Sequence, residues 1–325
     1  MLYTVHRTVK SQPLIDAHVH LYPDAQSGAL AKGSYQIWEY GEDPGVSFDD
    51  AVGVVEEVGD RFADRGFDYA VVLQLFDVSA ERKRITSDRD AAGGKRPLSD
   101  PEVDALLVEG LLAANRWAVD AASRHPILAA YIGIDPCLLP PRIITSHLAA
   151  MASLGARGIK LHPVTQGFEP SDARLDPVYE LCCELDLVVL SHSGPGHRHG
   201  ATARPSEFAP VLERWPRLRL VLAHLGGAAY DEAAELANDF PQVNFDLSEI
   251  IEWVGAPNAP SLETLVKIVQ DIGVDRVMLG SDFPWYDPSA TADKVASLPG
   301  LSTAEKAALL GGTAVEILRL ERTAA

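Results

Sequence analysis

The stretch 14-LIDAHVHLY-22 carries two histidines, one residue apart, at the end of an apolar run. Its composition predicts a buried β-strand, and side chains alternate between the two faces of a strand. Asp16, His18 and His20 are therefore expected on one face, with the apolar residues between them on the other. Three polar groups on one side of a buried strand need partners. A metal ion or a network of hydrogen bonds would supply them.

Short runs rich in Val, Ile and Leu recur along the chain and alternate with longer amphipathic segments. Near-continuous apolar runs separated by helical segments are typical of parallel strands covered on both faces. The runs occur at residues 14–22, 69–76, 127–136, 156–163, 187–195, 218–226, 243–250 and 277–285. Eight such units predict an α/β fold, a (β/α)8 TIM barrel, as a single domain over residues 1–325. A doubly wound open sheet is the alternative, but the first run lacks the Gly-rich turn that usually follows the first strand of that fold.

Two segments depart from this pattern, and both are predicted to be long loops. Residues 22–47 follow the first strand, show little periodicity and are expected to lie over the barrel mouth. Residues 79–102 follow the second strand and are strongly charged. Long ordered loops in compact domains are usually lids or binding loops. A solvated, partly disordered excursion is the alternative for both.

The composition limits the classes of partner. The formal net charge is -18, which argues against nucleic acid or an anionic membrane surface. Only three cysteines occur, two of them adjacent, so a disulfide framework is not expected. The N-terminal residues lack an apolar signal segment, and no apolar run reaches membrane-spanning length. These features predict a cytoplasmic protein, and they leave a homo-oligomer open.

Polar residues end several of the predicted strands. The active sites of (β/α)8 barrels lie where the strands end, so these side chains are expected to converge. They are His18, His20, Lys160, His162, His192, His224 and Asp282. Imidazole and carboxylate groups suit divalent zinc, iron or manganese, and open coordination positions mark a catalytic site. The sequence therefore predicts one or two divalent metal ions, with zinc first and iron or manganese as alternatives.

The motifs IDAHVHLYP, GIKLHP, SHSGPG, LAHLGG and LGSDFPW together resemble the amidohydrolase superfamily, and most closely its amidohydrolase-2 branch. That branch includes decarboxylases of aminocarboxymuconate semialdehyde and of resorcylate-type acids, and a lactonase of pyrone dicarboxylate. The resemblance spans all eight predicted strands. It implies that one divalent metal is held by His18, His20, His192 and Asp282.

The resemblance also implies roles for the remaining polar residues. His224 would be an acid/base group or a ligand to a second metal, and Asp282 would also act as general base. Lys160 matches the lysine that is carboxylated and bridges two metals in binuclear members. It could instead remain an ammonium that binds a substrate carboxylate. Independently of the resemblance, the position of Glu249 just beyond NFDLS predicts that it faces the site or caps the next helix.

The expected substrate is a small molecule that bears a carboxylate or a phosphate. Its anionic groups would be bound at the barrel mouth and by the basic cluster after the second strand. The candidate substrate-binding residues are Lys160, His162, Arg198, Arg82, Lys83 and Arg84.

Three classes of function remain open. The first is a metal-dependent hydrolase of an ester, lactone or amide, or its relative, a non-oxidative decarboxylase. The second is a non-heme di-iron oxygenase on the same scaffold, which would act on a larger, carrier-linked substrate such as a CoA ester. The third, a non-catalytic binding barrel, is disfavoured because every candidate ligand is present.

Overall fold

The strands of the computed structural model form one parallel sheet in the order β1 to β8. The model describes residues 12–40, 46–91, 98–196 and 200–320. The strands are β1 (Ile15–Val19), β2 (Tyr69–Leu73), β3 (Leu128–Gly133), β4 (Gly158–Leu161), β5 (Val188–Ser191), β6 (Arg219–Leu222), β7 (Val243–Asp246) and β8 (Val277–Met278). The residues after β8 return to β1: the Ala17 amide donates to the Leu279 carbonyl at 2.9 Å, and the Asp282 amide to the His18 carbonyl at 2.9 Å. The predicted (β/α)8 barrel is therefore confirmed.

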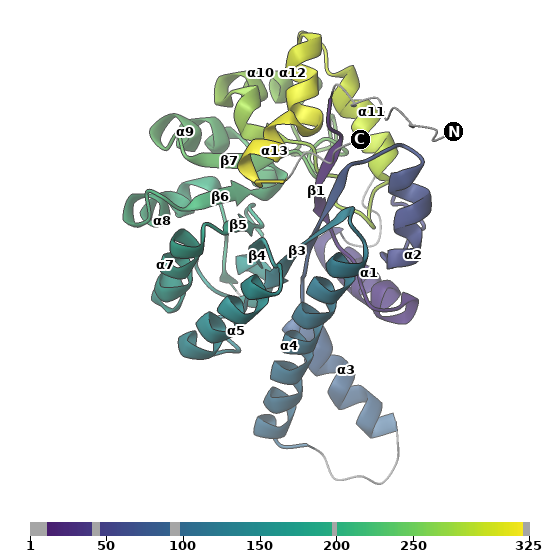
Figure 1. Cartoon of the computed structure of the whole chain (residues 1–325), viewed down its shortest axis with the longest axis vertical. Coiled ribbons are helices and arrows are strands. Elements are labelled where there is room, and N and C mark those ends of the chain that lie inside the picture. Colours follow the sequence, from purple (N-terminus) through teal and green to yellow (C-terminus); the bar gives the residue numbers. More distant parts are fainter. Residues whose placement is uncertain (1–11, 41–45, 92–97, 197–199, 321–325) are drawn as a thin grey trace, which may run out of the picture.

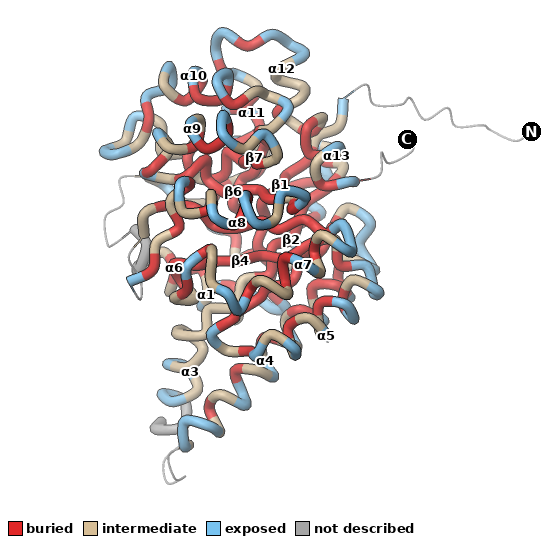
Figure 2. The backbone as a smooth tube through the Cα atoms, turned by 90° about the vertical axis from the view of Figure 1, so that its left-hand side faces the viewer, coloured by how far each residue is buried: buried red, intermediate tan, exposed pale blue. Residues whose placement is uncertain are grey.

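Helices surround the sheet and one pair projects from it (Figure 1). The helices are α1 (Ala25–Tyr40), α2 (Val55–Val58), α3 (Val78–Ala91), α4 (Asp100–Arg124), α5 (Pro141–Ser153), α6 (Pro163–Gln166), α7 (Asp176–Leu185), α8 (Ala209–Arg214), α9 (Asp231–Asp239), α10 (Leu262–Ile272), α11 (Pro288–Ser297), α12 (Thr303–Ala307) and α13 (Thr313–Ile317). The paired α3 and α4 extend away from the barrel as an arm (Figures 1 and 2). Within the described residues, no helix has both the length and the apolar character needed to cross a lipid bilayer.

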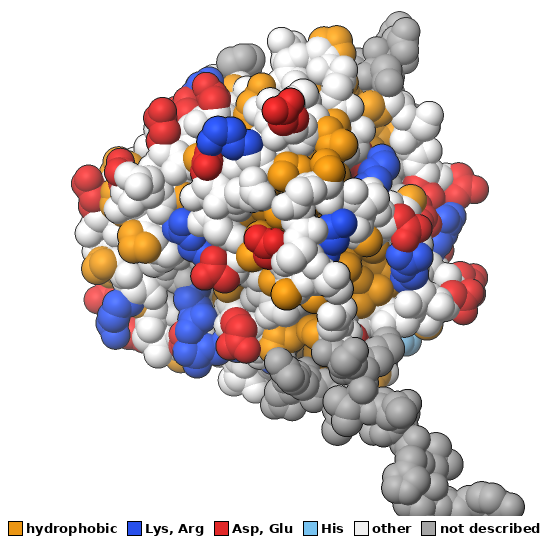
Figure 3. Space-filling model, turned by 90° about the horizontal axis from the view of Figure 1, so that it is seen from above, with side chains coloured by type: hydrophobic (Ala, Val, Ile, Leu, Met, Phe, Trp, Pro, Cys, Tyr) orange, Lys and Arg blue, Asp and Glu red, His pale blue; other side chains and the backbone are white. Residues whose placement is uncertain are grey.

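The buried core has two main layers, which appear as the red interior of Figure 2. One lies between the strands and the surrounding helices and includes Val19, Ile159 and Phe245. The other lies inside the barrel and includes Ile15 and Ala17. Seen from the end that carries α10 and α12, acidic and basic side chains are scattered over the surface (Figure 3). The net charge of -18 is thus not gathered into one patch on this face.

The strict alternation predicted for the first strand is wrong. Ile15 and Ala17 pack in the inner layer, whereas Val19 packs in the outer one. The pairing of β1 with β2 shifts register between Asp16 and Val19, as expected where a bulge interrupts a strand. His18 lies within this irregular interval, so local backbone geometry contributes to where its imidazole points.

The prediction of long loops after the first two strands is also wrong for the described residues, because both segments contain helices. Helix α1 begins after Asp24, whose Oδ1 accepts a hydrogen bond from the Ser27 amide at 2.8 Å. A Cβ at Gly28 would lie 2.0 Å from the Val52 carbonyl oxygen, so glycine is required where α1 packs on residues 49–53. Lys32 stabilises the same contact, because its Nζ donates a hydrogen bond to the Ala51 carbonyl oxygen at 2.8 Å. These tertiary contacts hold the helix although its sequence shows little helical periodicity.

Candidate metal centre

The two histidines of β1 present nitrogen atoms to one another. Nε2 of His18 and Nε2 of His20 are 3.2 Å apart. The other ring nitrogens are occupied: His18 Nδ1 lies 2.9 Å from Asp246 Oδ2, and His20 Nδ1 lies 2.8 Å from the Leu73 carbonyl oxygen. Acceptors at both Nδ1 atoms place the protons there and leave lone pairs on the Nε2 atoms. Two lone pairs that face each other in a buried place require a cation or a shared proton between them.

Asp282 completes a set of three donors. Its Oδ1 lies 3.4 Å from His18 Nε2 and 3.3 Å from His20 Nε2. Burial alone would raise the pKa of Asp282, but the neighbouring histidines outweigh it and hold this pKa well below its usual range. The carboxylate is thus ionised at neutral pH. Two imidazole nitrogens and one carboxylate oxygen, all within 4.8 Å of one another, match the donor set of a catalytic divalent metal site.

Two further sets of possible ligands adjoin this one among the described residues. They are His18, His224 and Asp246, and His224, Glu249 and Asp282. His224 belongs to both, and its Nδ1 lies 3.6 Å from Glu249 Oε2. Glu249 therefore faces the site, which was one of its two predicted positions. The three sets together offer enough donors for a second ion.

Lys160 lies at the base of this cluster, at the end of β4. Its Nζ is 3.3 Å from His18 Nε2, and the side chain is buried. Burial lowers the pKa of Lys160 to about 8, although nearby carboxylates oppose the shift. A lysine with this pKa exchanges its proton near neutral pH, so both predicted states, a carboxylated amine and an ammonium, are chemically accessible.

His162 and His192 form a second, stacked pair. Their ring centroids are 4.0 Å apart and the rings are nearly parallel. The Tyr35 hydroxyl of α1 lies 2.7 Å from His162 Nε2. Burial is the largest cause that lowers the pKa of both histidines, so both are neutral. His192 belongs to none of the three ligand sets found among the described residues, and its buried Nδ1 has no partner there.

Three residues of the centre have strained backbone conformations. His224, Glu249 and Asp282 have φ angles of 60°, 63° and 61°. Non-glycine residues adopt this left-handed region infrequently, and such strain concentrates at functional sites. In each case the unusual φ follows the end of a strand and turns the side chain toward the cluster.

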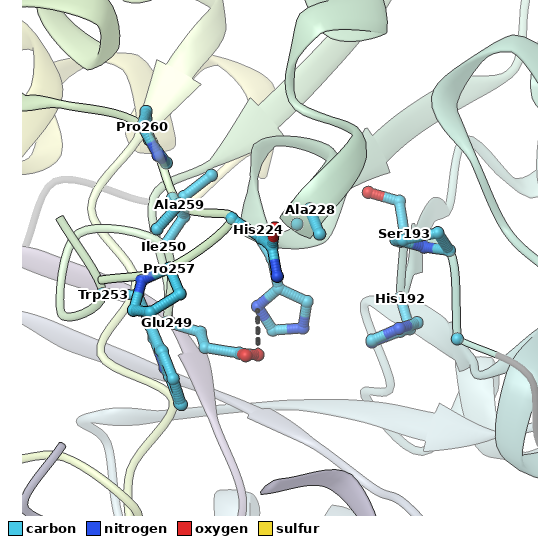
Figure 4. Close-up of a pocket in the computed structure, with 15 residues that line it drawn as sticks. His192, Ser193, His224, Ala228, Glu249, Ile250, Trp253, Pro257, Ala259 and Pro260 are labelled. Atoms are coloured by element: carbon cyan, nitrogen blue, oxygen red, sulfur yellow. Dashed lines mark ion pairs between the residues drawn. The ribbon is translucent and has the colours of Figure 1, made fainter. Parts of the chain in front are cut away.

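A cavity of about 420 Å³ opens beside His224 (Figure 4). The His224 imidazole lies between the Glu249 carboxylate and His192, and apolar residues lie on the Glu249 side, away from His192. These apolar residues include Ile250, Trp253 and Pro257. The lining contains no lysine or arginine among the described residues. Polar reacting groups thus face an apolar surface.

Three of the basic residues predicted to bind substrate, Arg82, Lys83 and Arg84, lie on α3, away from Lys160 and the donor cluster. Arg82 pairs with Asp104 of α4, and Arg84 pairs with Glu81 on its own helix. Lys83 is exposed on α3. Arg198 lies outside the described residues. The predicted convergence thus holds for the strand ends, whereas α3 carries its cations on the projecting arm.

Sequence reasoning missed three residues of the centre. Asp246 ends β7 and contacts His18, and Ser248 Oγ lies 3.0 Å from His18 Nδ1 and 2.9 Å from His224 Nδ1. The sequence signal for Asp246 and Ser248 was the alternation of apolar and polar residues in FDLS, which resembles the pattern at the other strand ends. Tyr35 was missed because its segment was predicted to be a loop.

Comparison with known proteins agrees with this geometry. Residues 15–320 match the model of the amidohydrolase family Amidohydro_2. The 2-amino-3-carboxymuconate-6-semialdehyde decarboxylase of Dictyostelium discoideum is 24% identical, over 64% of this chain and 66% of its own length. That match therefore leaves about a third of the relative uncovered.

Two solved structures share the fold. One, from Pseudomonas putida, is assigned as a 2-pyrone-4,6-dicarboxylic acid hydrolase (TM-score 0.60, 21% identity, 96% of this chain and 100% of that one). The other is a dihydroxybenzoic acid decarboxylase from Polaromonas, with bound manganese and the inhibitor 2-nitroresorcinol (TM-score 0.63, 14% identity, 95% of this chain and 97% of that one). Because the family model covers the whole barrel and its strand ends carry the metal-type donors, this chain is an enzyme that belongs to the amidohydrolase family.

Proposed function

We propose that this chain is a metal-dependent decarboxylase that removes carbon dioxide from an organic acid. The observation that carries the proposal is the facing pair of His18 and His20 Nε2 atoms, 3.2 Å apart and next to the ionised Asp282. These three residues would hold the ion. A divalent metal bound there would supply positive charge that orients the substrate and stabilises the electron pair left on carbon when carbon dioxide departs.

The chain's own residues supply the other requirements of the reaction. Lys160, whose Nζ lies 3.3 Å from His18 Nε2, would bind an anionic group of the substrate. The apolar wall at Ile250 and Trp253 disfavours a charged carboxylate relative to neutral carbon dioxide. His224 Nδ1 lies 3.1 Å from the Ser248 carbonyl oxygen, which holds the ring in one orientation. Its Nε2 would take a proton from water and deliver it to the substrate carbon as the bond from that carbon to the departing carbon dioxide breaks.

Hydrolysis of a lactone or ester is the second candidate. It is favoured by one observation, the ionised Asp282 beside the metal-type donors, which could accept a proton from water. The Pseudomonas neighbour, assigned as a hydrolase, is consistent with it. The two-iron oxygenase is not carried forward, because neither the family match nor the three relatives named above support it.

The decisive experiment measures both reactions on the protein loaded with Zn²⁺ or Mn²⁺. Carbon dioxide release is assayed with 2,6-dihydroxybenzoate and with 2-amino-3-carboxymuconate 6-semialdehyde, and acid release with 2-pyrone-4,6-dicarboxylate. We expect metal-dependent carbon dioxide release that falls by roughly 10²-fold or more in Asp282→Asn. Asp271→Asn, which changes an exposed carboxylate paired with Lys267, is the matched control and should retain full rate. Acid release without carbon dioxide would replace the proposal by the hydrolase, and no metal-dependent turnover of any of the three would overturn both.

A further inference from the structure

A second cavity, of about 630 Å³, lies beside α1. It lies among α1, the end of β2, α3, α4 and the segment after β8. Trp285 lines it and stands edge-on to His20, with ring centroids 5.5 Å apart. Further aromatic side chains line it: Tyr22, Tyr35, Phe76 and Trp117. Through Trp285 the cavity adjoins the metal centre, and the proposed decarboxylation makes no use of it.

Two buried polar atoms on the lining residues have no partner among the described residues. They are Oε1 of Gln74, a side chain 3% exposed, and Nε1 of Trp285, which is 2% exposed. A buried polar group without a partner is unfavourable, and such groups in native proteins are few. One of these atoms accepts a hydrogen bond and the other donates one. A bound group that both donates and accepts would satisfy them.

The charges at this cavity disfavour an anionic occupant. Asp24, Asp77 and Glu81 line it, and Arg84 is the one cation among its described lining residues. Arg84 is already paired, with Nη2 2.7 Å from Glu81 Oε2. The net charge of the lining is thus negative.

We propose that this cavity binds the distal part of the substrate, an uncharged tail that carries a carboxamide. This inference rests on the proposed function. The acid end would occupy the metal centre. The amide N–H would donate to Gln74 Oε1, and the amide carbonyl would accept from Trp285 Nε1. The substrate class is therefore an elongated organic acid with a hydrogen-bonding neutral tail, and Gln74 and Trp285 are its specificity-determining residues.

The test uses three hydroxamic acids, whose common head group binds divalent metals. Acetohydroxamic acid is the head alone, and 6-acetamidohexanohydroxamic and nonanohydroxamic acids add tails of equal length with and without an amide. Calorimetric titration of the Zn²⁺-loaded protein should show roughly tenfold tighter binding of the amide-bearing compound than of nonanohydroxamic acid. In Gln74→Leu and in Trp285→Phe the preference should fall to roughly threefold or less, while acetohydroxamic acid binds each variant as it binds the parent.

Trp215→Phe provides the matched control. Trp215 Nε1 is also a buried indole nitrogen without a described partner, but Trp215 lies at the end of α8 and does not line the cavity. This variant should keep the tenfold preference. Equal affinity of the two long compounds for the parent protein, or an unchanged preference in Gln74→Leu, would overturn the inference.

A second measurement separates this inference from the proposed function. N-pentylacetamide, a tail without a head group, is titrated into the metal-free protein and followed by ligand-observed NMR. Binding of N-pentylacetamide that is lost in Gln74→Leu supports the cavity assignment, even if acetohydroxamic acid fails to bind. Failure of acetohydroxamic acid to bind would count against the metal-dependent function alone. Binding of acetohydroxamic acid with no contribution from the amide tail would overturn the cavity assignment and leave the proposed function standing.

Discussion

The strand-end cluster around His18 and the arm formed by α3 and α4 both gather ionisable side chains, but their surroundings differ. In the cluster, His18, His20 and Asp282 are buried and each ring has a fixed partner. On the arm, Arg82 and Arg84 are paired with nearby carboxylates on the surface. Burial makes every partner in the cluster necessary, whereas water can replace partners on the arm. Density of charge in the sequence is therefore a poor guide to function compared with burial at a strand end.

The largest effect is expected from removing the facing imidazoles. His18→Ala combined with His20→Ala should abolish stoichiometric metal binding and metal-dependent turnover, because both nitrogen donors of the main set are lost. Metal content by plasma mass spectrometry and far-ultraviolet circular dichroism would be measured together. The control is His125→Ala with His147→Ala, which removes two imidazoles that follow or lie on helices. A folded double variant of His18 and His20 that retains full metal content would refute the site.

A smaller effect is expected at a residue that acts through His18. Asp246→Asn would replace a carboxylate at the His18 Nδ1 proton by an amide, while Asp246 also accepts from the His224 amide at 3.0 Å. Loss of such a partner typically weakens metal affinity by roughly 10- to 100-fold. Chelator competition gives the affinity, with Asp271→Asn as control. Unchanged affinity would show that the imidazole is held by other contacts.

Asp135 is a buried carboxylate near the base of the arm. It therefore tests whether burial, and not charge alone, distinguishes the strand-end cluster from the arm. Burial raises its pKa from 3.8 to about 6, although two backbone amides donate to its Oδ1. Between these values the unfolded chain releases the proton and the folded chain retains it, so stability falls as pH rises through this window. Asp135→Asn should remove that loss, about 2 to 3 kcal/mol, and keep the two hydrogen bonds.

Urea unfolding of the Asp135 variant would be compared with the parent protein at pH 4.5 and pH 7.5. The stability gained by the variant should be larger at pH 7.5. An equal gain at both pH values would mean that the carboxyl group is not protonated in the folded state.

The smallest effect is expected on the arm. Arg82→Ala combined with Lys83→Ala removes exposed charges, and exposed pairs contribute between 0 and about 1 kcal/mol. Metal content should be unchanged, and kcat and KM should each change less than about twofold. Arg84 is left intact because it lines the second cavity. A rise in KM that disappears in added salt would restore the hypothesis that this basic cluster binds an anionic substrate.

The fold and the donor residues could be predicted because their signals are local. Each apolar run predicts a strand by itself, and a polar residue at its end is visible without knowing any partner. Helix α1 could not be predicted in this way, since it depends on Gly28 fitting against Val52 and on Lys32 reaching residues 49–51. The register shift in β1 likewise depends on its pairing with β2.

By itself the sequence determined that eight parallel strands would close into a barrel and bring His18, His20, His224 and Asp282 to one end, because strand periodicity and chain order suffice for that. Only the tertiary structure decided which of these atoms meet. Asp246 reaches His18 Nδ1 across 228 residues of sequence, and His192 stacks on His162 and joins none of the ligand sets described. The reason is physical: donor geometry within a few ångströms depends on left-handed turns at His224 and Asp282 and on the packing of neighbouring strands, which are properties of the folded chain and not of any single segment.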